Sequence, residues 1–64
     1  MRKSAAEDIL DYLYTRGRVP VTQLMLDLSH WRRYTLRKNL ERLRRYGFIK
    51  IEVIDGVEYV RLVR

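Results

Sequence analysis

The side chains best suited to chemistry in this sequence are the basic residues between Arg32 and Arg45. Seven of the chain's 14 lysines and arginines lie in this stretch, together with Leu36, Leu40 and Leu43 at the spacing i, i+4, i+7. At about 100° per residue, this spacing predicts a helix with one apolar face and a cationic face opposite it. The planar guanidinium of arginine matches phosphate oxygens and the guanine edge, and a helix fits the width of the DNA major groove. The pattern therefore predicts a helix that contacts nucleic acid.

A second interpretation is that the cationic face is only solvated. Glu41, the one acid of this stretch, would then pair with Arg37 or Arg45 four residues away. We favour a polyanionic partner. A solvated face normally mixes charges of both signs, whereas nearly all the charged residues of this face are positive.

Size and composition exclude most enzyme classes. The chain has 64 residues, a net charge of +6, no cysteine and one histidine, and its sequence pI is about 10.2. We expect one small domain, residues 1–64, near the lower size limit for a core without crosslinks. Without cysteines no thiolate metal site can form, and a structural zinc would need another strong ligand beside His30. We also expect no catalytic triad, and no glycine-rich phosphate loop is present. We therefore expect no catalytic residue, metal or cofactor.

The hydrophobicity of the chain predicts a protein inside the cell. No apolar run approaches the roughly 20 residues that span a bilayer, and no signal-peptide core follows the first residues. We expect a cytoplasmic, nucleoid-associated protein with no membrane contact. Gln23 and Asn39 are the only side-chain amides, and such depletion of thermolabile residues fits a thermophilic source.

Two helices are predicted before the cationic one. Ser4 and Glu7 have the spacing of a capping box at the start of a helix that Gly17 ends. Residues 18–20 form an extended link before a proline, and Val19 is expected to add a short strand to the sheet. Residues 21–28 suit a second helix, although their alternating leucines also suit a strand.

The boundaries of the cationic helix follow from its flanking residues. It should begin between Arg32 and Tyr34 and end near Tyr46, with Gly47 at the first position beyond the cap. Trp31, in the turn before it, is expected to plug the core at this turn rather than to serve as a stacking platform.

The last segment predicts a β-hairpin. Asp55-Gly56 is a strong signal for a two-residue type I′ turn, which pairs Ile54 with Val57 and, at the far end, Ile49 with Leu62. In this register one face of the hairpin carries Ile49, Ile51, Val53, Val60 and Leu62, with Glu58 as its only polar member.

This order of elements resembles the winged helix-turn-helix domains of transcription regulators such as the MarR, ArsR and Lrp groups. The resemblance covers Ser4 to Val63, and its most specific part is residues 35–49, which are similar to the recognition helix and wing entry. The sequence departs from this pattern at two places. The turn at 29–33 is about one residue longer than usual, and Pro20 stands where a Ser or Thr cap is common. The resemblance implies an α+β fold, a three-helix winged helix-turn-helix with a C-terminal β-hairpin wing, whose third helix binds duplex DNA in the major groove.

The resemblance also implies roles along the third helix. Side chains of the first turns would reach base edges, while Arg42 and Arg45 would meet phosphates. Thr35 would contact either a phosphate or a base, and Lys50 and Arg61 would follow the backbone from the outer face of the wing. The complete predicted set is Arg32, Arg33, Tyr34, Thr35, Arg37, Lys38, Arg42, Arg45, Lys50 and Arg61.

The expected function is sequence-specific binding of double-stranded DNA by a transcription regulator. Two alternatives stay open: a winged helix that serves as a protein–protein adaptor, and a protein that binds RNA or chromatin without sequence preference. Tyr12 and Tyr14 flank the apolar face of the first helix, where they indicate either ordinary half-burial or a homodimer interface. A two-fold dimer would set its recognition helices about 34 Å apart.

Overall fold

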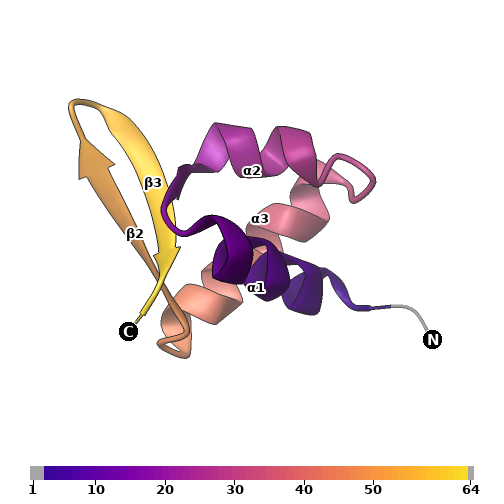
Figure 1. The fold of residues 1–64 in the computed structure, drawn as a ribbon. Coiled ribbons are helices and arrows are strands. Elements are labelled where there is room, and N and C mark those ends of the chain that lie inside the picture. Colours follow the sequence, from indigo (N-terminus) through magenta and orange to yellow (C-terminus); the bar gives the residue numbers. More distant parts are fainter. Residues whose placement is uncertain (1–2, 64) are drawn as a thin grey trace.

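The protein is an α+β molecule with three helices and a small three-stranded antiparallel sheet. The computed structural model describes residues 3–63, so residues 1, 2 and 64 of the predicted domain 1–64 lie outside the described part. The hairpin stands beside the helices, and α1 packs against α3 (Figure 1). The elements are α1 (Ala5–Arg16), β1 (Val19–Pro20), α2 (Val21–Asp27), α3 (Arg33–Arg45), β2 (Ile49–Ile54) and β3 (Val57–Leu62).

The first helix begins and ends as its sequence predicts. The Glu7 amide donates to the Ser4 hydroxyl, and the Ser4 amide donates to the Glu7 carboxylate, which completes the capping box. Gly17 follows α1 with a φ of 77°, a conformation that costs least for glycine. Its amide donates to the Leu13 carbonyl, so the end of the helix is capped as well.

The segment Val21–Asp27 forms a helix, as we predicted, and not a strand. Leu24 and Leu28 are buried on its inner side, whereas Leu26 is 69% exposed. The alternation of leucines that also suited a strand therefore places one leucine in solvent. Pro20 precedes α2 without a side-chain cap, because proline supplies the extended backbone but no capping oxygen.

The third helix ends in a Schellman motif. The Phe48 amide donates to the Leu43 carbonyl and the Gly47 amide to the Arg44 carbonyl, with Gly47 at a φ of 84°. This is the arrangement that satisfies the last carbonyls of a helix through a left-handed glycine. It turns the chain directly into β2.

The hairpin has the predicted register. Ile54 pairs with Val57, and the pairing continues to Ile49 with Leu62. Asp55 and Gly56 have φ angles of 52° and 78°, as a type I′ turn requires at both central positions. The predicted third strand is also confirmed, because Val19 pairs with Val60 and gives the sheet order β1-β3-β2.

One core joins all the elements. Its most completely buried members come from every helix and from both strands of the hairpin: Ile9, Leu13, Leu24, Leu36, Ile49 and Val60. Trp31 packs against this core, as predicted for the turn before α3, but it is only partly buried.

The predicted apolar face of the hairpin is covered by the core over only part of its length. Val53 is 67% exposed, although the register places it on the same face of the hairpin as Ile49 and Ile51. The strands extend past the helices (Figure 1), so side chains near the turn have no element to pack against. Strand alternation fixes the face on which a residue lies but not the extent of the core beneath it.

Candidate nucleic-acid interface

The inner side of α3 is held by the three predicted leucines. Leu36, Leu40 and Leu43 are 0%, 4% and 5% exposed. Burying a leucine side chain contributes about 1.5–3 kcal/mol, so the three together fix which side of the helix faces the core. The remaining side chains must then lie on the flanks or on the outer side.

The outer side of α3 gathers five of the predicted contact residues. Tyr34, Arg37, Lys38, Arg42 and Arg45 line one shallow surface hollow together with Glu41, and all are exposed. The Lys38 Nζ atom lies 5.8 Å from the centroid of the Tyr34 ring, within reach of a cation–π contact. We call these six residues the outer face of α3.

The only acid of this face is paired with a residue of the same helix. The Arg44 guanidinium donates to the Glu41 carboxylate, and this hydrogen bond, followed by the charge of Arg44, holds the pKa of Glu41 below its ordinary value. Glu41 therefore does not pair with Arg37 or Arg45, the two partners considered for a solvated face. An i, i+3 contact is as close as i, i+4 on a helix, and Arg44 is the cation that satisfies it here.

This pairing leaves the predicted cations of the outer face available. Among residues 3–63, the ion pairs include none of Arg37, Lys38, Arg42 and Arg45. Since Arg44 offsets Glu41, the outer face presents four positive charges with no anion of the protein bound to them.

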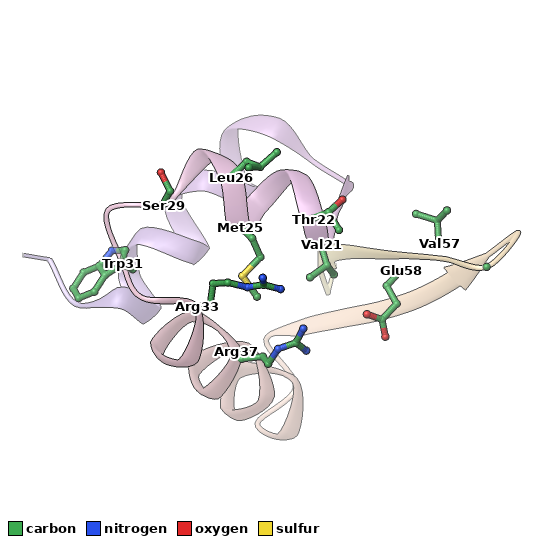
Figure 2. A pocket seen from close by; sticks show the side chains of 11 residues that line it. Val21, Thr22, Met25, Leu26, Ser29, Trp31, Arg33, Arg37, Val57 and Glu58 are labelled. Carbon is green, nitrogen blue, oxygen red and sulfur yellow. The ribbon is translucent and has the colours of Figure 1, made fainter.

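Two of the predicted residues also line a larger groove. Arg33 and Arg37 lie between α2, α3 and the turn of the hairpin (Figure 2), in a groove of about 810 Å³. Met25, Leu26, Val57 and Glu58 also line it, and Met25 points towards Arg33 (Figure 2). Arg37 lines both surfaces, so the groove and the outer face form one continuous candidate interface.

The residues at the start of α3 have different surroundings. Arg32 is exposed at the N-cap without making a side-chain cap. Thr35 is half-buried, and its backbone carbonyl accepts a 2.8 Å hydrogen bond from Asn39 Nδ2. Their predicted contacts with nucleic acid stay predictions.

The hairpin residues differ in how far they are engaged. Lys50 is exposed and lies opposite Arg61. Arg61 Nε donates to Glu52 Oε2 at 3.3 Å, and its Nη1 donates to the Leu62 carbonyl at 3.1 Å. Arg61 would have to release or share these contacts to bind a phosphate, whereas Lys50 would not.

Sequence reasoning missed Arg18 as a member of this surface. Its guanidinium carbon lies 5.1 Å from the centroid of the Tyr59 ring on β3. The signal was available, because pairing Val19 with the hairpin brings the preceding residue beside the same strand. Arg18 therefore adds a cation beside β3, the strand that also carries Arg61.

A second missed residue, Asp8, fixes the turn that precedes α3. Asp8 Oδ2 accepts a 2.7 Å hydrogen bond from Trp31 Nε1 and a 3.0 Å hydrogen bond from His30 Nε2. The bond from Trp31, then that from His30, holds the pKa of Asp8 below its ordinary value of 3.8. The contact joins residues 23 positions apart, so no local pattern could reveal it.

No other class of site is evident in the described part of the chain. Within residues 3–63 no group of three or more His, Cys, Asp and Glu side chains could hold a metal ion. No helix among them is long and apolar enough to cross a bilayer.

No protein-family model matches the chain, and no curated protein or solved structure is significantly similar to it.

Proposed function

We propose that this chain is a winged helix-turn-helix domain that binds duplex DNA and acts as a transcription regulator. In this proposal α3 enters the major groove, α2 and α3 form the helix-turn-helix, and the β2–β3 hairpin is the wing. Such binding would associate the protein with the nucleoid.

The observation that carries the proposal is the unpaired positive charge of α3. The helix has six basic residues and one acid, and that acid is bound by Arg44. Four cations side by side repel one another, and this repulsion is relieved when a polyanion neutralises them. DNA releases condensed counterions when lysine and arginine replace them at its phosphates, which makes such a face favourable for binding.

The position of the helix supports a duplex rather than a single strand as the partner. The leucine side is buried and the cationic side projects, so the helix offers a straight, rigid ridge of the width of a major groove. Single-stranded nucleic acid is usually bound on exposed aromatic platforms. Tyr34 is the one exposed aromatic residue among the six of the outer face.

The test is binding of a labelled duplex, measured by fluorescence anisotropy over a series of salt concentrations. Arg42→Ala and Arg45→Ala should each weaken all duplexes alike and lower the slope of log affinity against log salt by about one. Lys3→Ala is the matched control, because it removes the same charge from an exposed residue before α1. If Lys3→Ala weakens binding as much as Arg42→Ala, only net charge matters and the proposed interface is wrong.

Sequence specificity requires a second pair of variants. Arg37→Ala and Lys38→Ala should cost roughly 1–3 kcal/mol on a duplex selected from a random pool, and much less on unselected DNA. Equal losses on both duplexes would indicate a chromatin protein without sequence preference. The same measurement with an RNA duplex separates the RNA-binding alternative.

One observation favours the adaptor alternative. The groove between α2 and the hairpin exposes Leu26 and Val57, at 69% and 42%, and aliphatic side chains on a surface are typical of protein contacts. If wild-type protein and the four α3 variants bind duplex equally weakly, the adaptor function takes the place of DNA binding.

A further inference from the structure

One edge of the sheet has no neighbouring strand in a single copy of the chain. The strand order is β1-β3-β2, so β2 is paired on one side only, and the hairpin stands beside the helices (Figure 1). An edge strand, here of six residues, presents backbone amides and carbonyls to which another strand can bind. We call the side of β2 that faces away from β3 the β2 edge.

The register of the hairpin determines which backbone groups the β2 edge presents. The residues that flank a two-residue turn exchange hydrogen bonds, and such pairs alternate along the strands with pairs that do not. Ile54 and Val57 flank the turn, so the backbone groups of Lys50 and Glu52 point towards β3. The odd-numbered residues of β2 point theirs outward: Ile49, Ile51 and Val53. Among residues 3–63, no loop, cap or side-chain hydrogen bond reaches these outward groups.

A second copy of β2 fits the β2 edge in an antiparallel register with matched charges. A two-fold axis beside Ile51 sets Ile51 opposite its own copy and Ile49 opposite Val53 of the second copy, so the outward groups bond one another. Lys50 of each copy then lies opposite Glu52 of the other. Opposite charges directly across an antiparallel pair are favourable, and the side chains of such a non-hydrogen-bonded pair lie close together.

The neighbouring registers lack this match. An axis beside Lys50 or Glu52 sets a charge opposite its own copy, which is unfavourable. An axis beside Ile49 or Val53 places both charged residues opposite uncharged ones. Charges on an edge strand usually prevent pairing with other chains, but one base and one acid two positions apart complement a second copy of themselves. The charge pattern of β2 therefore favours a second copy over an arbitrary strand.

The exposure of Val53 supports the same register. Val53 is 67% exposed on the face of the hairpin that carries the core, because the helices of its own copy do not cover it. Residues opposite one another in a sheet share a face, so pairing brings Ile49 of the second copy beside Val53. Ile49 is 1% exposed within the core of its own copy. Pairing thus extends the apolar layer of each copy to the uncovered end of the other.

We propose that the chain forms a homodimer in which the β2 edges of two copies pair antiparallel about an axis beside Ile51, with Lys50 of each copy bound to Glu52 of the other. Arg61 Nε donates to Glu52 Oε2 at 3.3 Å, and the second oxygen of this carboxylate can accept from Lys50 of the other copy. Tyr12, one of the two tyrosines considered for a dimer, is 9% exposed and takes no part. The inference does not depend on DNA binding.

The test is the mass of the chain in solution, measured by sedimentation equilibrium from about 10 μM to about 1 mM protein. The average mass should rise from the monomer value of 7.8 kDa towards twice that value. Lys50→Glu and Glu52→Lys each set like charges opposite one another at two places in the dimer. Each should raise the dimer dissociation constant at least about tenfold. A wild-type chain that stays monomeric over the whole range contradicts the proposal.

Mixing the two variants tests the register itself. In an equimolar mixture, one chain carries acids at both positions and the other carries bases at both. The mixed dimer therefore regains both opposite-charge pairs and should form with an affinity close to that of the wild type. If the wild type dimerises but the folded variants do not recover on mixing, the proposed register is wrong.

Lys38→Glu and Glu41→Lys are the matched controls. They make the same two changes of charge on α3, outside the β2 edge, so each should dimerise like the wild-type chain and their mixture should gain nothing. Circular dichroism shows whether all four variants are folded. If the controls weaken the dimer as much as the β2 variants do, only net charge matters and the proposal is wrong.

Amide hydrogen exchange tests the pairing without any substitution. The outward amides of Ile51 and Val53 should become protected as the concentration of the wild-type protein rises through the range in which its mass increases. The amides of Lys50 and Glu52, which are bonded to β3, should be protected throughout. If the mass rises while the protection of Ile51 and Val53 stays unchanged, the interface lies elsewhere and the proposal is contradicted.

Discussion

The hydroxyl of Tyr12 on α1 donates a hydrogen bond to the carboxylate of Asp27 at the end of α2. Gln23 Nε2 donates to the same carboxylate at 3.0 Å, and Arg16 Nη1 lies 4.0 Å from it. Asp27 therefore links α2 to α1 through Tyr12 and Arg16, while Gln23 binds the same carboxylate from within α2. Together with the bond from Trp31 to Asp8, this contact fixes α2 and the start of α3 against α1.

The first prediction concerns alkaline pH. Burial first, and then the hydrogen bond to Asp27, raises the pKa of Tyr12 from 10.0 to about 12. Because the folded pKa is above the unfolded one, the neutral phenol contributes stability that is complete below pH 10 and is lost as pH rises through the folded value. Tyr12→Phe should be less stable at neutral pH and should lose less stability between about pH 10 and 12.

The measurement is denaturant unfolding at several alkaline pH values. Tyr14→Phe is the control, since Tyr14 is 81% exposed, and its unfolding free energy should decline with pH as in the wild-type chain. Parallel declines for Tyr12→Phe and the wild type would contradict the assignment.

The second prediction concerns acid. The pKa of Asp8 is lowered by the bonds from Trp31 and His30, so the ionised carboxylate stabilises the fold. This contribution is complete well above the unfolded pKa of 3.8 and is lost as pH falls through the folded value. Asp8→Asn should lower the melting temperature at neutral pH and flatten its fall on acidification.

Melting followed by circular dichroism from about pH 7 to pH 3 measures this difference. Asp11→Asn removes a carboxylate from the same helix but leaves the contacts of Asp8 intact, so it should fall with pH as the wild type does. A wild-type acid profile for Asp8→Asn would show that the contact with Trp31 does not depend on the charge.

The third prediction concerns the anchoring of α3. Leu40 is 4% exposed, and its replacement by alanine leaves a cavity in the centre of the core. Leu40→Ala should cost roughly 2–5 kcal/mol of unfolding free energy, a large part of the stability of so small a domain. Leu26→Ala, at a 69% exposed leucine, should change the unfolding free energy by less than about 0.5 kcal/mol. Chemical denaturation measures both, and similar costs would mean that the observed core is wrong.

Much of this fold follows from local sequence signals. The capping box of α1, the Asp55-Gly56 turn and the glycine after α3 each involve residues within a few positions of one another, and each is present as predicted. The register of the whole hairpin follows from the single turn, because strand pairing propagates from it.

The features that the sequence did not reveal depend on which residues come together in the folded chain. Val53 has the alternation of a core residue, but only the extent of the helices decides whether it is covered. Trp31 donates a hydrogen bond to Asp8, 23 positions away in the sequence. Glu41 pairs with Arg44, although other arginines lie at similar spacing on the same helix. In the candidate interface, the basic residues and the side of α3 on which they lie were predictable from the sequence. The pairing of Glu41 with Arg44, which leaves the four cations of the outer face without a bound anion, was not.

The fourth prediction concerns Glu58, on the rim of the groove that Arg33 and Arg37 line. A carboxylate there repels an approaching phosphate, so Glu58→Gln should tighten duplex binding by roughly two- to fivefold at moderate salt. Asp11→Asn removes the same charge from an exposed position of α1 and should have a smaller effect. Equal gains in affinity from the two variants would show that the groove does not approach the DNA.

Backbone amide spectra of ¹⁵N-labelled protein, recorded during titration with a duplex, show whether α3 is the surface that meets DNA. We expect the largest shifts on Arg33–Arg45, with smaller shifts at the hairpin near Lys50 and little change along Ala5–Arg16. Adding salt should reverse these shifts together. Shifts confined to α1, or none at stoichiometric duplex, would contradict the claim.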